Sequence, residues 1–153
     1  MPGLGTEEVL KRLQALDHDL TLRPYYSEEA ILYNPGEAAP FGVIFATVKD
    51  HDGPNDKASD LSRAGVYRLA FQLSRAEYED RFGPLPARPP KGGTIATDLD
   101  LQALDLLTPH PVYGWMRWAQ VLSPRAATLR ALEPLFEEAL VVVRQKWSRR
   151  KAA

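Results

Sequence analysis

His110 is the histidine best placed for chemistry in this sequence. It lies in a proline-stiffened corner beside Tyr113. The other two, His18 and His51, lie at the end of a predicted helix and in a polar loop. A general base needs a pKa near neutrality and a carboxylate that orients its second nitrogen, and the sequence fixes no such carboxylate. His110 could therefore serve an enzyme together with an aspartate of the loop 49–60. The commoner alternative is that it caps backbone carbonyls at the end of a preceding helix.

Arg68 is the cation best placed to bind an anion. It lies on the less apolar face of a predicted strand, where its planar guanidinium could hold an anionic group through two hydrogen bonds. Lys49 and Arg117 become its neighbours if their strands pair. The alternative is a structural ion pair between Arg68 and an Asp or Glu, which is the more frequent role for such an arginine.

Two tryptophans, Trp115 and Trp118, could provide a stacking surface for an aromatic ligand. Residues three positions apart lie on opposite faces of a regular strand, so at most one of them does so. We expect Trp118 in the core and Trp115 partly exposed. The candidate ligand-binding residues are Arg68, His110, Lys49, Tyr113, Trp115 and Arg63.

Two further groups of charges suggest other functions. Four aspartates in the loop 50–60 offer oxygen ligands for calcium, but their spacing does not fit an EF-hand, so we expect a solvated loop and no metal or cofactor. Residues 108–153 carry 8 basic and 3 acidic side chains, whereas residues 1–60 carry 5 and 11. This basic end makes nucleic acid a possible partner. Its candidate residues are Arg144, Lys146, Arg149 and Arg150.

The composition limits the class of protein. With 153 residues the chain is long enough for one domain with a substantial core, and we expect a single domain over 1–153. The absence of cysteine excludes disulfides, thiolate zinc sites and cysteine nucleophiles, and favours a cytoplasmic location. The start of the chain lacks the basic residues of a signal peptide, and no apolar run is long enough to span a membrane.

The sequence pattern predicts an α+β fold, with a mainly antiparallel sheet of about five strands packed against N- and C-terminal helices. Residues 148–153 are expected to be frayed. The predicted strands cover residues 20–26, 30–33, 41–48, 65–73 and the tryptophan-containing stretch 110–124, and the predicted helices cover 6–17, 75–82, 98–108 and 133 onward. The first strand contains Pro24 and should lie at an edge of the sheet.

Several segments in combination resemble a small bacterial family of domains of unknown function. They are Lys49-Asp50, Asp56, residues 59–63 and 65–69, Phe82-Gly83, residues 110–113, Trp118 and residues 122–124. The resemblance covers roughly residues 40–142. That family is in turn distantly similar to the MmcQ/YjbR-like proteins, which have an antiparallel sheet packed against helices and have been proposed to bind DNA. Ser123 and residues 114–117 depart from the family's pattern.

Three functions follow from these observations, in order of preference. The first is a non-enzymatic domain that binds a small ligand or a partner on the face that carries Arg68, between the loop 49–63 and the His110 corner, with a small anion as one candidate ligand. The second is the nucleic-acid-binding protein that the resemblance and the basic C-terminus imply. The third is an enzyme that uses His110. The third comes last because no nucleophile, metal set or phosphate loop accompanies the histidine.

Overall fold

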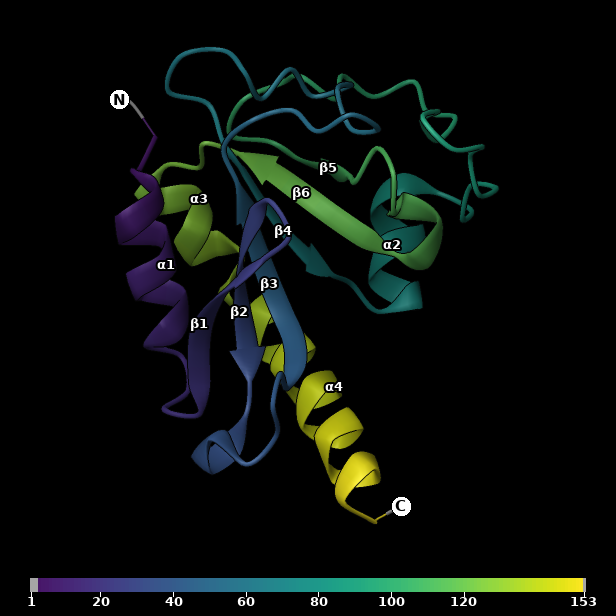
Figure 1. The fold of residues 1–153 in the computed structure, drawn as a ribbon. Coiled ribbons are helices and arrows are strands. Elements are labelled where there is room, and N and C mark those ends of the chain that lie inside the picture. Colours follow the sequence, from purple (N-terminus) through teal and green to yellow (C-terminus); the bar gives the residue numbers. More distant parts are fainter. Residues whose placement is uncertain (1–2, 153) are drawn as a thin grey trace.

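The computed structural model describes residues 3–152, and it arranges them around one six-stranded antiparallel sheet (Figure 1). The strand order is β1-β2-β3-β4-β6-β5. The strands are β1 (Leu20–Tyr25), β2 (Glu28–Tyr33), β3 (Val43–Lys49), β4 (Arg68–Gln72), β5 (Leu107–Pro109) and β6 (Trp118–Leu122). The predicted α+β class is confirmed, with one more strand than expected. Pro24 lies in β1, at an edge, as predicted.

Helices α1 (Thr6–Gln14) and α4 (Glu133–Ala152) pack against one face of the sheet, and α3 (Ala126–Ala131) leads into α4 (Figure 1). The α4 helix begins at Glu133 as predicted, because Pro134 is tolerated only in a first turn. Its helical backbone continues to Ala152. The predicted fraying of residues 148–153 stays a prediction, and residue 153 lies outside the described residues.

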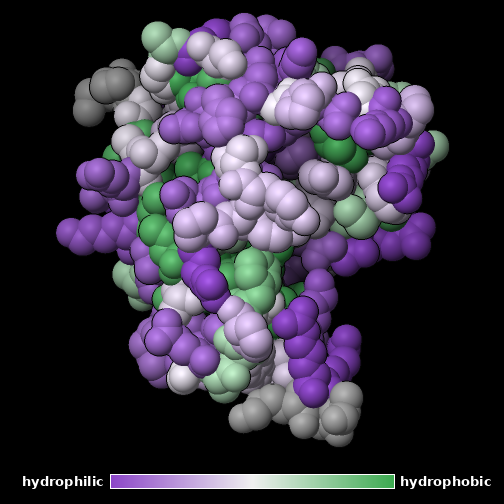
Figure 2. Space-filling model, viewed as in Figure 1, coloured by the Kyte–Doolittle hydropathy of each residue, from purple (hydrophilic) through white to green (hydrophobic). Residues whose placement is uncertain are grey.

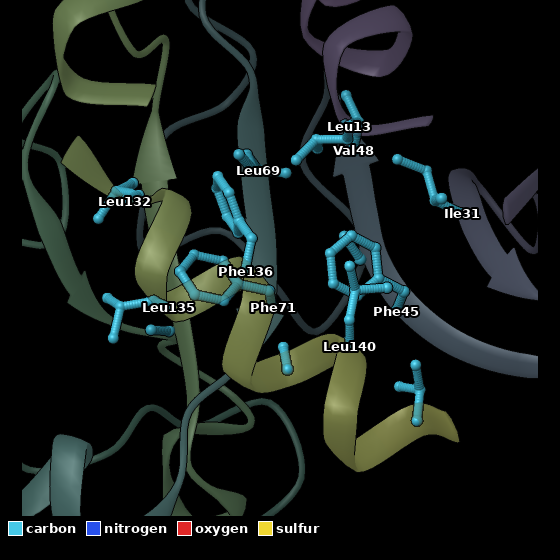
Figure 3. Packing of buried hydrophobic residues seen from close by; sticks show 14 of the residues in the cluster. Leu13, Ile31, Phe45, Val48, Leu69, Phe71, Leu132, Leu135, Phe136 and Leu140 are labelled. Carbon is cyan, nitrogen blue, oxygen red and sulfur yellow. The ribbon is translucent and has the colours of Figure 1, made fainter. Parts of the chain in front are cut away.

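The core lies between this helical layer and the sheet (Figure 3). Phe136 of α4 packs with its ring centre 4.8 Å from that of Phe71 and 6.4 Å from that of Phe45. Tyr67 and Leu69 are buried on the same face as Phe71. This confirms the alternation predicted for residues 65–73.

The second face of the sheet is not the wetter one that the sequence predicted. Arg68 and Ala70, which point to this face, are 0% and 1% exposed. They are covered because the connections 50–67 and 84–106 pass over this side of the sheet (Figure 1). Leu61 and Val66 of the connection 50–67 form a smaller apolar cluster with Leu122 of β6.

Helix α2 (Arg75–Phe82) has the bounds that the sequence predicted. The Ser74 hydroxyl accepts a hydrogen bond from the Glu77 amide at 3.2 Å, and Gly83 ends the helix with a φ of 85°. None of the helices in the described part of the chain has an apolar stretch long enough to cross a membrane.

Two predicted elements are wrong. Residues 98–106 form turns instead of a helix, because Thr97 and Asp100 bind nearby backbone amides and compete with helical hydrogen bonds. The tryptophan-containing stretch is a strand only from Trp118 to Leu122. Trp115 lies in a short 3-10 turn that ends at Arg117, whose φ is 70°.

Candidate functional site

A cavity of about 600 Å³ opens on the face of the sheet opposite α4. Its floor is formed by side chains that alternate with the core residues of β3, β4 and β6, namely Ile44, Thr47, Ala70 and Trp118. Its walls are the β1–β2 turn (residues 25–28), the turn 53–56 and the corner 110–116. Figure 2 faces the same side as Figure 1, and pale side chains of intermediate hydropathy gather over the β1–β2 turn in this view.

Three charged side chains meet beside this cavity. The Arg68 guanidinium donates two hydrogen bonds to the Asp56 carboxylate, at 2.6 and 2.9 Å. The Lys49 ammonium donates a third, at 3.0 Å. Lys49 and Arg68 are neighbours because they are paired residues of β3 and β4. Arg68 therefore forms the structural ion pair that was the alternative to ligand binding.

The Arg68 side chain is held on its other side by a buried polar network. Its Nε atom donates to Gln120 Oε1 at 2.7 Å, and the Ser59 hydroxyl donates to the same oxygen. The Gln120 amide in turn donates to Thr108 Oγ1 at 3.1 Å. Arg68, Ser59, Gln120 and Thr108 are all buried. The network fixes the guanidinium, which in turn fixes Asp56 and the turn that carries it.

The ion pair lowers the pKa of Asp56 well below its usual range. Burial alone would raise this pKa, but the hydrogen bonds and the charge of Arg68 outweigh it, with smaller contributions from His110 and Lys49. Asp56 is therefore ionised at neutral pH. The buried cluster of Arg68, Lys49 and Asp56 has a net charge of +1.

His110 is 4% exposed, and the cavity lining includes it. Its Nδ1 atom accepts hydrogen bonds from the backbone amides of Val112 and Tyr113, at 3.1 and 3.2 Å. An acceptor at Nδ1 requires the neutral tautomer with its proton on Nε2. The prediction that His110 caps the carbonyls of a preceding helix is therefore wrong. The element directly before His110 is the strand β5, and the imidazole accepts hydrogen bonds from the amides of the turn that follows.

The pKa of His110 lies well below its ordinary value. Burial is the main cause, and the charge of Arg68 adds to it, while Asp56 opposes it. No carboxylate binds either ring nitrogen within residues 3–152, because the carboxylate of Asp56 is taken up by Arg68 and Lys49. The predicted pairing of His110 with a loop aspartate is therefore absent from the described structure.

The polar groups at the inner end of the cavity include two hydrogen-bond donors, Lys49 and His110, beside the Asp56 carboxylate. Among the described residues Lys49 Nζ has one partner for its three hydrogens, and His110 Nε2 has none. No fully buried side-chain nitrogen or oxygen among the described residues lacks a partner, so the Nε2 atom of His110 retains some exposure. Gly53 allows this arrangement, because a Cβ at its position would lie 2.9 Å from Lys49 Nζ.

Glu28 and three tyrosines line the outer part of the cavity. Glu28 is half-buried and forms no ion pair with another described residue. The rings of Tyr25 and Tyr26 meet edge to face with centres 4.8 Å apart, and Tyr113 lies with its ring 5.1 Å from that of His110. Burial raises the pKa of Tyr25, and the proximity of Tyr26, Tyr113 and Glu28 adds to this shift.

Three predicted ligand-binding residues lie in the lining, namely Lys49, His110 and Tyr113. Arg68 lies behind Asp56 and not at the cavity surface. Arg63 binds the carbonyls of Ser59, Asp60 and Gln102 instead and so fastens one covering segment to another.

The partial exposure predicted for Trp115 is confirmed, whereas the prediction that Trp118 lies in the core is wrong. Trp115 lies under the guanidinium of Arg88, 4.9 Å from its ring centre, and outside the cavity. Trp118 is half-buried in the lining, whereas the buried core tryptophan is Trp147. Arg117, a predicted neighbour of Arg68, donates instead to the carbonyl of Leu73.

Sequence reasoning missed several lining residues. Tyr25, Tyr26 and Glu28 had no signal beyond their place in or just after the first predicted strand. Asp56 was one of the four aspartates considered as calcium ligands. Its pairing with Arg68 could not be predicted from the sequence.

The four candidate nucleic-acid residues lie along the last turns of α4, and three of them make structural contacts. The Lys146 ammonium donates to Gln72 Oε1 at 3.4 Å. Arg144 forms an ion pair with Asp17, and Arg150 donates to the carbonyl of Gly42 at 2.9 Å. The charges of Arg149 and Arg150 help to lower the pKa of Lys146, after burial of its ammonium. A group of cations is therefore present, although part of it holds the helix to the rest of the protein.

Comparison with known proteins identifies the family. The chain matches a family of unknown function, DUF6194, over residues 4–152. It belongs to that family. No curated protein and no solved structure matches the chain. The predicted membership of a family of domains of unknown function is thus confirmed for this DUF6194 chain, and its likeness to the MmcQ/YjbR-like proteins stays a prediction.

Proposed function

We propose that this DUF6194 protein is a non-enzymatic binding domain whose cavity holds the anionic group of a small ligand against Lys49 and His110. The observation that carries the proposal is the pair of unused donors at the inner end of the cavity. A ligand group placed there must accept hydrogen bonds. The net charge of the cluster of Arg68, Lys49 and Asp56 favours an anion over a neutral acceptor.

The size and shape of the cavity support this reading. A volume of about 600 Å³ lies within the range of about 300–1,000 Å³ that is usual for small-molecule sites. The lining combines apolar floor residues with a few fixed polar groups, which is also usual for such sites. The buried network behind Lys49 fixes its partner Asp56 before any ligand arrives, and this lowers the entropic cost of binding.

Calorimetric titration with matched acids and amides tests the proposal. The probes are 2-naphthoate and decahydro-2-naphthoate, each compared with its neutral amide, at low salt. We expect at least one acid to bind more tightly than its amide by about 10-fold or more, because charged hydrogen bonds contribute about 1.5–3 kcal/mol. Lys49→Met should remove this preference, and Lys57→Met, an exposed lysine of the same loop, should retain it.

Two results of this titration would contradict the proposal. One is equal binding of acids and amides, or no binding of either acid. The other is an unchanged preference in Lys49→Met while circular dichroism reports a folded protein. Both ring systems are tested so that the result for the acid group does not depend on the ring.

A second candidate function is nucleic-acid binding at the end of α4, supported by the grouping of Lys146 with Arg149 and Arg150. The predicted likeness to MmcQ/YjbR-like proteins favours the same function. A gel-shift assay at low salt tests it, because counterion release makes such binding strongest there. A shift of the nucleic acid that the double substitution Lys146→Gln, Arg149→Gln abolishes would support this function. The absence of any shift with the wild type would exclude it. The cytoplasmic location also stays a prediction.

A further inference from the structure

Tyr26 is in an unfavourable position for a tyrosine. Its φ is 54°, in the left-handed region that side chains other than glycine, asparagine and aspartate seldom adopt. Its side chain is 91% exposed, so the large ring gains little from burial. Tyr26 and Ser27 form the two-residue turn between β1 and β2, because Tyr25 and Glu28 are the last paired residues. Of the two, only Tyr26 has a positive φ, and two-residue turns with a positive φ at the first position favour glycine there.

The strained turn holds Tyr26 at the mouth of the cavity. Its ring contacts Tyr25 edge to face, and both rings belong to the lining. Tyr113, which is 46% exposed, and Trp118 line the cavity from the corner 110–116 and from β6. Aromatic side chains therefore line the cavity from separate segments of the chain, and residues with strained backbones cluster at ligand sites.

We propose that the ligand is an aromatic acid whose ring packs against Tyr26 and Tyr25 while its acid group lies against Lys49 and His110. This inference rests on the proposed function and adds the chemical class of the ligand. Exposed tyrosine rings offer flat faces for stacking, and they contribute contact area at a low cost in conformational entropy. An aromatic ring between the walls would cover the exposed surface of Tyr26.

Glu28 decides the orientation of the ligand. Its carboxylate at the β1–β2 turn repels an acid group placed at the mouth, whereas the donors of Lys49 and His110 attract one at the inner end. Tyrosines with a carboxylate would also suit a cationic ligand. The two unused donors at the inner end favour the acid, and a cationic probe is included in the test.

The test uses two substitutions at Tyr26 and one at its neighbour. Tyr26→Asn removes the ring and places a residue that tolerates the turn, and Tyr26→Phe keeps the ring without the hydroxyl. Ser27→Asn changes the same turn but leaves the ring in place. Binding of 2-naphthoate, decahydro-2-naphthoate and benzyltrimethylammonium is measured for each variant by calorimetry, and the melting temperature by differential scanning.

We expect the wild type to bind 2-naphthoate about 3- to 10-fold more tightly than its saturated analogue, since contacts between aromatic rings are favoured over equal apolar area. Tyr26→Asn should abolish that advantage, while Tyr26→Phe and Ser27→Asn retain it. Tyr26→Asn should also raise the melting temperature by roughly 2–6 °C, because it relieves the left-handed strain. Higher stability with weaker binding rules out unfolding as the cause of the loss.

Three outcomes would overturn the inference. If the two acids bind equally tightly and Tyr26→Asn does not change their affinities, the ligand is not specifically aromatic, and the proposed function still holds. Tighter binding of benzyltrimethylammonium than of either acid makes the ligand a cation. Failure of both acids to bind refutes the proposed function, and the inference with it.

Discussion

Substitution of Asp56 by asparagine tests the buried charge cluster most severely. The change keeps the shape of the side chain but leaves Arg68, which is 0% exposed, and Lys49, which is 7% exposed, without their counter-charge. Removal of one partner from a buried ion pair costs about 3–5 kcal/mol. In a chain of this length about 1 kcal/mol corresponds to 2–4 °C, so the melting temperature should fall by roughly 6–20 °C.

The pH dependence of stability gives an independent check on Asp56. Its pKa is lower in the folded protein than in the unfolded chain, where it is about 3.9. The stabilisation is therefore complete above about pH 4 and is lost as the pH falls toward the folded pKa. In Asp56→Asn this contribution to acid unfolding should be absent.

Urea unfolding at pH 7 and at pH 3 measures both effects. The matched control is Glu79→Gln, which removes a carboxylate from an exposed pair with Arg75 and should change stability by no more than about 1 kcal/mol. If Asp56→Asn were as stable as Glu79→Gln at pH 7, the reasoning about the buried cluster would be refuted.

Two other variants probe the cavity itself. His110→Asn should unfold at close to the wild-type urea concentration, because its side-chain oxygen can accept from the amides of Val112 and Tyr113, whereas His110→Ala should lose about 1–3 kcal/mol. The pKa of His110 is lower in the folded protein than in the unfolded chain, so the stability of the wild type should decline below about pH 6.5. In His110→Asn this decline should be weaker. Identical pH profiles of the two proteins would contradict the lowered pKa of His110. Glu28→Gln should tighten binding of 2-naphthoate by roughly 2- to 5-fold, since it removes a repulsive charge. Weaker binding in calorimetry would contradict the repulsive role assigned to Glu28.

The sequence predicted the fold well where local signals and burial agree. The alternation in residues 65–73 gave β4, and Ser74 with Gly83 gave the ends of α2. It failed for residues 98–106, where a run of leucines suggested a helix. Leu99, Leu104 and Leu106 are each more than 40% exposed, so the run has no buried face that would stabilise one.

The candidate site could be predicted in part, for a physical reason. Residue type identified Lys49 at the start of a predicted loop, Arg68 on a predicted strand and His110 in a predicted corner. Their roles depended on which segments cover the second face of the sheet, and this is a long-range property that residue spacing does not contain. The pairing of Arg68 with Asp56 moved the arginine out of the ligand's reach and left Lys49 at the surface of the cavity.

A crystal structure of the protein soaked with 2-naphthoate would test the central claim most directly. We predict a carboxylate oxygen within about 3.2 Å of both Lys49 Nζ and His110 Nε2, which is the range of a hydrogen bond. A carboxylate that points to solvent at the mouth of the cavity, or that lies on the basic end of α4, would contradict the account.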